Sequence, residues 1–116
     1  MPICYISTNL KDDKVAGDLE DKLQECIAEV LNKPSERITV TINTGLRMKF
    51  NGERQPGLLC QLRSIGVFDK ERNPSYFPHL FHTLTKATGL PPSSITIEFV
   101  DIPAYMVMNG SALSSK

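Results

Sequence analysis

The second residue of the chain is a candidate for acid–base chemistry. Pro2 follows Met1 directly, and the short apolar run at residues 3–6 predicts a β-strand. If Met1 is removed, Pro2 becomes a free secondary amine at the start of an ordered strand. An ordinary α-amino group titrates at about 7.7–8.0, so such an amine can act as a general base near neutral pH. A second explanation stays open, because proline lacks the N–H that a sheet ladder needs and is tolerated at the first position of a strand.

The histidines and cysteines do not predict a metal site or a disulfide framework. His79 and His82 lie three positions apart on one expected helix, a spacing that can bind a metal, but no third ligand is evident and a solvated helix face is favoured. Cys4, Cys26 and Cys60 are widely spaced and form no C-x-x-C pair. Reduced thiols are therefore expected, with Cys60 as a buried apolar residue.

Length and charge narrow the class of protein. The 116 residues predict a single domain, spanning 1–116, that is large enough for its own core. Thirteen Lys and Arg residues balance thirteen Asp and Glu residues, so no partner nucleic acid or anionic membrane is expected. No apolar run approaches the ~18–20 residues of a membrane-spanning helix, and the first residues lack the pattern of a signal peptide. The expected compartment is the cytoplasm.

Hydrophobic periodicity predicts the helices and strands that must position Pro2. Apolar residues recur at helical spacing from Asp18 to Asn32, and again from about Ser75 to Thr88, where Pro78 is expected in the first turn. Four runs of apolar or alternating residues are expected to be strands, at residues 3–6, 37–42, 58–65 and 95–100.

Two shorter features are predicted from turn signals and composition. The Asn51-Gly52 pair predicts a hairpin turn between residues 46–50 and 58–65. The apolar residues at 104–108 predict a short edge strand near the end of the chain.

The chain repeats itself at a spacing of 57 residues. Pro34 matches Pro91 and Ile38 matches Ile95, and the same spacing sets Ser7 opposite Ser64. The domain is therefore expected to consist of two strand–helix–strand halves, at about residues 1–57 and 58–116.

Two such halves, joined through a short hairpin, predict an α+β fold with a four-stranded mixed sheet. Both helices are expected on one face, since each crossover is right-handed. The residues expected under the helices are Ile38, Val40, Ile42, Ile95, Ile97 and Phe99. The residues expected on the other, polar face are Thr39, Thr41, Gln61, Arg63, Thr96 and Glu98. This polar face meets solvent or lines a wet interior shared between subunits.

These motifs, in this order, resemble the macrophage migration inhibitory factor and D-dopachrome tautomerase family. The likeness covers nearly the whole chain and rests on the Met-Pro start, "NKP", "SIG", "LPPSSITIEF" and the final "NG". It implies a tautomerase-like fold, a homotrimer and an active site at each subunit interface. It also implies keto–enol tautomerisation of a small 2-keto acid or dopachrome-like substrate, with Pro2 as the base and with no metal or organic cofactor.

The resemblance also implies which residues bind substrate. Lys33, in "NKP", would hold a substrate carboxylate and lower the pKa of the amine, although a solvated lysine at a helix C-terminus is the plain alternative. Ser64 and Ile65, in "SIG", would form the pocket wall, with the Ile65 N–H binding a substrate oxygen. Arg37 replaces a tyrosine of many members and could bind a carboxylate.

Other positions depart from the family pattern. The tyrosine that many members contribute from a neighbouring subunit falls at Thr96, and the asparagine two residues on falls at Glu98. A carboxylate there should weaken the binding of an anionic aromatic substrate by Coulomb repulsion. The pocket valine of the family maps to Val107 or to Met106. The family's C-x-x-C is "GLLC" here, so thiol–disulfide activity is not expected.

A second function stays open beside the tautomerase. The family also implies a catalytically weak, cytokine-like signalling protein, released without a signal peptide, that binds a cell-surface receptor through its trimer surface. The two functions are compatible, and we expect a tautomerase of shifted specificity.

Overall fold

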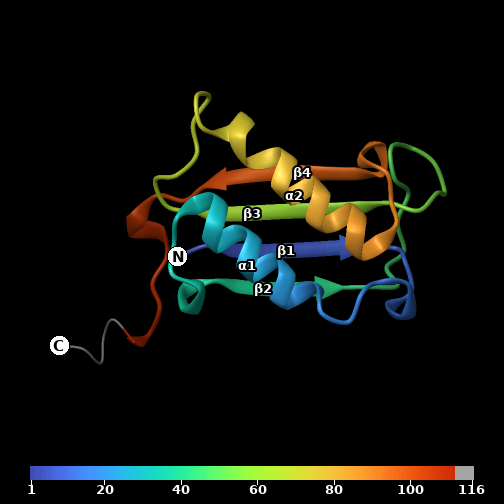
Figure 1. The fold of residues 1–116 in the computed structure, drawn as a ribbon, viewed down its shortest axis with the longest axis horizontal. Helices are drawn as coiled ribbons and strands as arrows, with labels where there is room; N and C mark the ends of the chain where they lie inside the picture. Colours follow the sequence, from blue (N-terminus) through green and yellow to red (C-terminus); the bar gives the residue numbers. More distant parts are fainter. Residues whose placement is uncertain (112–116) are drawn as a thin grey trace.

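The computed structural model describes residues 1–111 as a four-stranded sheet that carries two helices on one face (Figure 1). The strands are β1 (Ile3–Thr8), β2 (Thr39–Asn43), β3 (Leu58–Ser64) and β4 (Ile95–Asp101), and the helices are α1 (Leu19–Leu31) and α2 (Asn73–Thr88). The predicted α+β architecture is confirmed. The last part of the second predicted half, residues 112–116, lies outside the described residues.

The strands lie in the order β2-β1-β3-β4. β1 is parallel to β2 and antiparallel to β3, and β3 is parallel to β4. Each half is thus a β-α-β unit, and the first strands of the two halves form the centre of the sheet. The predicted hairpin between the halves is wrong, because β2 and β3 lie on opposite sides of β1 and residues 44–57 connect them as a loop.

The turn inside this loop forms, but the strand expected before it does not. Asn51 and Gly52 both have positive φ angles, of 50° and 79°, and a single bridge joins Phe50 to Glu53. Residues 46–49 form no strand. Both edges of β1 are already paired, so residues 46–49 do not pair with this strand.

The 57-residue repeat holds at the ends of the helices but not in the first strands. Asn32 and Gly89, 57 positions apart, both end a helix in the left-handed conformation. In β1 and β3, however, even-numbered residues face the helices. Equivalent residues of these strands must therefore differ by an even number, and the expected match of Ser7 with Ser64 is wrong.

The second helix begins two residues earlier than expected. Pro74, rather than Pro78, occupies the first turn, where a missing N–H costs no helical hydrogen bond. The residue before the helix, Arg72, donates its backbone N–H to the Asp69 carboxylate at 2.7 Å. This hydrogen bond lies before the first apolar residue of the helix, so the apolar periodicity of the sequence did not reveal where the helix begins.

The core lies between the helices and the sheet. The residues expected under the helices are buried or packed against the core cluster. The opposite side, called the open face below, carries the side chains of Ile3, Tyr5, Thr39, Thr41, Leu59, Gln61, Arg63, Thr96, Glu98 and Val100. Tyr5 and Leu59 are 42% and 44% exposed there, so the open face is less polar than the sequence predicted.

The predicted C-terminal edge strand is absent from the described residues. Residues Ala104–Met106 form a 3₁₀ turn, and nothing after Asp101 in the described part is a strand. Pairing stops here because β3 ends at Ser64, the partner of Asp101, and the Ile102 N–H makes the last bond to it. Tyr105, Met106 and Met108 are left 88%, 68% and 68% exposed. None of the helices through Ser111 is long and apolar enough to cross a membrane.

Candidate active site

Pro2 is held at the amino end of the central strand β1. Its side chain is buried on the helix-covered side of the sheet, and its carbonyl accepts a hydrogen bond from the Thr39 N–H at 3.1 Å. Ile3 pairs with Arg63 in the antiparallel ladder, so Pro2 lies opposite Ser64 at the next position. The residue predicted to be the base is therefore bonded to β2 and lies level with the end of β3.

The terminal amine of the chain lies in a surrounding that favours its neutral form. Partial burial lowers the pKa of the Met1 amine below its ordinary value, and the positive charges of Lys33 and then Arg37 lower it further. The structure thus brings Lys33 and Arg37 to the start of β1, as the sequence predicted. A neutral amine is the form that can accept a proton.

Local backbone features position both cations. Asn32 ends α1 with a φ of 53°, and the Lys33 N–H turns back to the Ala28 carbonyl at 3.0 Å. Arg37 closes the 3₁₀ turn at residues 35–37, with its N–H on the Pro34 carbonyl at 3.1 Å. Lys33 is half-buried and Arg37 is exposed.

The end of β3 directs the Ile65 N–H towards β1. The Ile102 N–H donates to the Ser64 carbonyl at 2.8 Å, so this carbonyl points to the β4 side. The peptide bonds are trans, and in a trans peptide the C=O and the following N–H point in opposite directions. The Ile65 N–H therefore points away from β4, to the side on which Pro2 lies.

The Ser64 hydroxyl is buried beside this position without a partner. Ser64 is fully buried, and its Oγ has no hydrogen-bond partner among the described residues. An unsatisfied buried hydroxyl is unusual and costs stability.

Thr96 and Glu98 lie far from Pro2 in the same chain. Register sets Glu98 level with Tyr5 and Thr96 level with Ser7, in each case two strands away. At about 3.3 Å per residue and 4.8 Å per strand, they lie about 14 Å and 19 Å from Pro2, and on the opposite side of the sheet. One chain does not bring these two predicted residues to the amine.

Val107 lies near the amino end of β1 but on the open face. A pocket of about 510 Å³ is lined there by Val107, Met106, Ile3 and Arg63 among others, and Pro2 is not part of its wall. Val107 is half-buried and extended, whereas Met106 is largely exposed. Both alternatives for the family's valine line this pocket.

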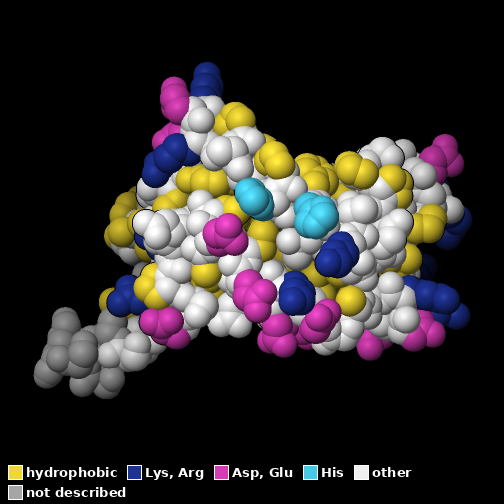
Figure 2. Space-filling model, viewed as in Figure 1, with side chains coloured by type: hydrophobic (Ala, Val, Ile, Leu, Met, Phe, Trp, Pro, Cys, Tyr) yellow, Lys and Arg dark blue, Asp and Glu magenta, His cyan; other side chains and the backbone are white. Residues whose placement is uncertain are grey.

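No group of three or more His, Cys, Asp or Glu side chains in residues 1–111 could hold a metal ion. The two histidines are exposed on α2, on the helix-covered face shown in Figure 2. The Cys4 and Cys60 sulfurs lie 3.9 Å apart in the core. Contact with Cys4 and burial raise the pKa of the Cys60 thiol well above its ordinary value, and burial raises the pKa of Cys26. These thiols are core residues with little nucleophilic character.

Sequence reasoning missed the side chains that hold the backbone around Ile65. The Asp101 carboxylate accepts the Gly66 N–H at 3.1 Å, and the Arg72 guanidinium donates to the Gly66 carbonyl at 3.2 Å. The spacing of Asp69 and Arg72 was a local signal for their ion pair. No signal marked Asp101, because its partner is 35 residues away.

Replacing Ser64 by alanine should not destabilise the fold. The change removes a buried hydroxyl that has no partner, so we expect the free energy of unfolding to stay constant or rise by about 1 kcal/mol. The matched control is Thr8→Val, since the buried Thr8 hydroxyl donates to the Gly57 carbonyl at 2.7 Å and accepts the Leu10 N–H at 3.1 Å. This control should lose about 1–3 kcal/mol. Equal losses in the two variants, measured by denaturant unfolding, would contradict a free Ser64 hydroxyl.

Comparison with known proteins agrees with this geometry. The family model described as macrophage migration inhibitory factor matches residues 1–114. The chain is 34% identical over 116 residues to D-dopachrome decarboxylase-B of Xenopus laevis, with 98% of both chains covered. It is 36% identical over 112 residues to a macrophage migration inhibitory factor homolog of Trichuris trichiura, with 96% of this chain and 98% of the relative covered.

A solved structure shows the same fold. The macrophage migration inhibitory factor of Trichinella spiralis superposes with a TM-score of 0.87 at 29% identity, over 92% of this chain and 95% of that one. The Met-Pro start, the β-α-β repeat and the full-length match lead to one conclusion: this chain belongs to the macrophage migration inhibitory factor family.

Proposed function

We propose that the protein is a keto–enol tautomerase in which Pro2, once Met1 is removed, is the general base. The observation that carries the proposal is the place of Pro2 at the start of β1, next to the Met1 amine whose pKa is lowered by partial burial and then by the charges of Lys33 and Arg37. The name of the Xenopus laevis relative, D-dopachrome decarboxylase-B, supports a dopachrome-like substrate, and two cations near the amine suit a 2-keto acid.

The reaction needs one proton to move between carbon and oxygen. Pro2 takes a proton from the carbon next to the substrate carbonyl, and the carbonyl oxygen gains the negative charge of an enolate. The Ile65 N–H stabilises that charge, and protonation of the oxygen gives the enol. Lys33 and Arg37 hold the substrate carboxylate, and the Ser64 hydroxyl binds a further polar group. The reverse sequence returns the proton to carbon.

The complete site requires a second copy of the chain. Thr96 and Glu98 lie too far from Pro2 to act in one chain, and we propose that a neighbouring subunit of a homotrimer supplies them. The exposed apolar residues Tyr105, Met106 and Met108 support association, because a chain that stayed monomeric would leave them in water.

Glu98 shifts the expected substrate preference. Its Oε1 accepts a hydrogen bond from the Gln61 amide at 2.7 Å, which holds the carboxylate on the open face. In a site shared between subunits, this negative charge would weaken the attraction of Lys33 and Arg37 for a substrate anion. We expect weaker binding of anionic aromatic substrates than a neutral residue would allow.

A signalling role is the second candidate function. The relatives named macrophage migration inhibitory factor homologs favour it, and weak catalysis through Thr96 and Glu98 would leave the trimer surface as the main binding feature. Such a protein would reside in the cytoplasm and, once released, bind a receptor at a cell surface.

Replacing Pro2 by glycine should abolish most activity. Protein shown by intact mass to lack Met1 should tautomerise phenylpyruvate and a dopachrome ester, and Pro2→Gly should reduce kcat/KM by about 10²–10⁴-fold because the positioned secondary amine is lost. The exposed Pro91, before β4, provides the control variant Pro91→Gly, which should keep the wild-type rate. A processed wild type no faster than Pro2→Gly on either substrate would end the tautomerase proposal and leave signalling.

The pH dependence of kcat/KM should report the lowered pKa of the amine. The base is active when deprotonated, so the rate should rise with pH through the pKa of the Pro2 amine. Lys33 and Arg37 lower the pKa of the Met1 amine one residue away, after the effect of its partial burial, and we expect both cations to lower the pKa of the Pro2 amine as well. Lys33→Met removes a positive charge that disfavours the protonated amine, so the rising limb should move to higher pH. Arg37→Gln should move the rising limb less. Lys86→Met, on α2, should not move it. If kcat/KM of Lys33→Met rises at the same pH as that of the wild type, Lys33 does not lower the pKa of the amine.

The mass in solution should be three times that of the chain. Sedimentation equilibrium of the wild type measures it directly, and Tyr105→Glu tests the exposed C-terminal turn. Tyr105 is 88% exposed in one chain, so the change should leave the stability of a monomer within about 0.5 kcal/mol. We expect it to weaken association through a buried charge at the interface. A monomeric wild type would contradict a shared site.

A further inference from the structure

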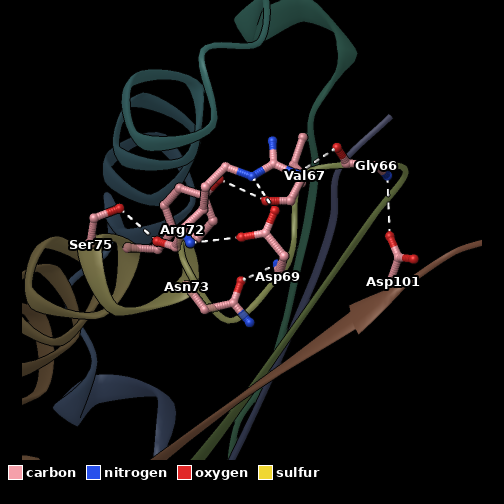
Figure 3. Close-up of polar contacts among 8 residues, drawn as sticks. Gly66, Val67, Asp69, Arg72, Asn73, Ser75 and Asp101 are labelled. Atoms are coloured by element: carbon pink, nitrogen blue, oxygen red, sulfur yellow. Dashed lines mark hydrogen bonds and ion pairs between the residues drawn. The ribbon is translucent and has the colours of Figure 1, made fainter.

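Gly66, the residue after Ile65, has both of its backbone polar groups held by side chains. Its φ of 69° lies in the left-handed region, so the chain turns sharply at this point. Asp101, at the end of β4, accepts the Gly66 N–H at 3.1 Å, and Arg72 donates to the Gly66 carbonyl at 3.2 Å. Figure 3 shows the two side chains approaching Gly66 from different segments.

Arg72 is itself held by Asp69. The Arg72 Nε donates to the Asp69 Oδ2 at 2.7 Å, and its backbone N–H donates to the Oδ1 at 2.7 Å (Figure 3). Asn73 accepts the Asp69 N–H at 3.0 Å and closes the turn. The hydrogen bonds from Arg72 lower the pKa of Asp69, and those same bonds raise the pKa of Arg72, so the pair stays ionised around neutral pH. A guanidinium with one side on a carboxylate has little freedom to leave the Gly66 carbonyl.

Three consecutive peptide groups around Ile65 are therefore fixed from outside. The peptide between Ser64 and Ile65 is held by the Ile102 N–H, the next by Asp101 and the third by Arg72. The Ile65 side chain is apolar and cannot orient its own N–H. The direction of that N–H depends on these neighbours.

We propose that Asp101 and Arg72 are positioning residues for the tautomerase reaction: they fix the peptide groups that follow Ile65 and so aim the Ile65 N–H at the substrate oxygen. This inference rests on the proposed function. A donor that stabilises a developing enolate must keep its geometry, because a displacement of about 1 Å can cost up to about 10²-fold in rate. Asp101 and Arg72 are both exposed, and exposed polar contacts add little to folding stability. Their effect should therefore be visible in catalysis more than in unfolding.

The test compares two substitutions of Asp101 in protein that lacks Met1. Asp101→Ala removes the acceptor of the Gly66 N–H, and kcat/KM for phenylpyruvate should fall about tenfold with the loss mainly in kcat. Asp101→Asn keeps an acceptor oxygen in the same place and should stay within about threefold of wild type. The melting temperature and the pKa of the rising pH limb should be unchanged in both variants. Glu71→Ala is the control for the change of charge, because it removes an exposed carboxylate from the loop that contains Gly66 and Arg72.

Amide hydrogen exchange gives a readout that does not depend on turnover. The Ile65 and Gly66 amides should exchange faster in Asp101→Ala and in Arg72→Ala, and at the wild-type rate in Asp101→Asn and Glu71→Ala. Wild type without activity would end the proposed function and this role with it. An active enzyme in which Asp101→Ala keeps its kcat/KM, or in which Asp101→Asn fails as badly, would overturn the positioning role alone.

Discussion

The antiparallel pairing of β1 with β3 is the contact on which the candidate site depends. It joins the two β-α-β halves through their first strands and makes both of these strands central, with a neighbour on each edge. Chain termini usually fray, but here the first strand is tied into the middle of the sheet. The same pairing sets Pro2 opposite Ser64. An amine at the very end of a chain can act as a catalytic base only when it is held in this way.

The cations near the amine follow from the parallel pairing of β1 with β2. A parallel pair requires the chain to return to the end at which it started, and α1 makes that return. The residues that lead into β2, including Lys33 and Arg37, must then lie beside the start of β1. The pKa of the Met1 amine is lowered first by partial burial and then by the charges of Lys33 and Arg37, in a chain that carries no net charge. The antiparallel relation of the two halves puts the corresponding segment of the second half, with Thr96, at the opposite end of the sheet.

The proposed sharing of the site between copies has the same origin. One chain brings Pro2, Lys33, Arg37 and the Ile65 N–H to one end of β1, and its open face and C-terminal turn leave apolar side chains in water. Local restraints complete the donor: Asp101 from β4 and Arg72 from the loop before α2 reach the same glycine. The site thus combines a base fixed by the sheet with a donor fixed by two side chains that take no part in the core.

The sequence by itself determined the elements whose signals are local. The helical periodicity of residues 18–32 and the strand alternation around Ile95 need no information from elsewhere in the chain, and both were confirmed. The left-handed ends at Asn32 and Gly89 also follow from residue type. The resemblance of "NKP" and "SIG" to a known family nominated Lys33 and Ile65 before any geometry was known.

Only the tertiary structure decided how these pieces meet. Residues 46–49 and 104–108 form no strand although their composition favours one, because strand formation depends on pairing with another segment and not on composition alone. The side of the sheet on which Ser64 lies depends on register, and a shift of one residue reverses it. The bond between Asp101 and Gly66 joins residues 35 positions apart, a distance over which the sequence carries no signal. Contacts of this kind arise only when the whole sheet is assembled, and the proposed orientation of the Ile65 N–H depends on them.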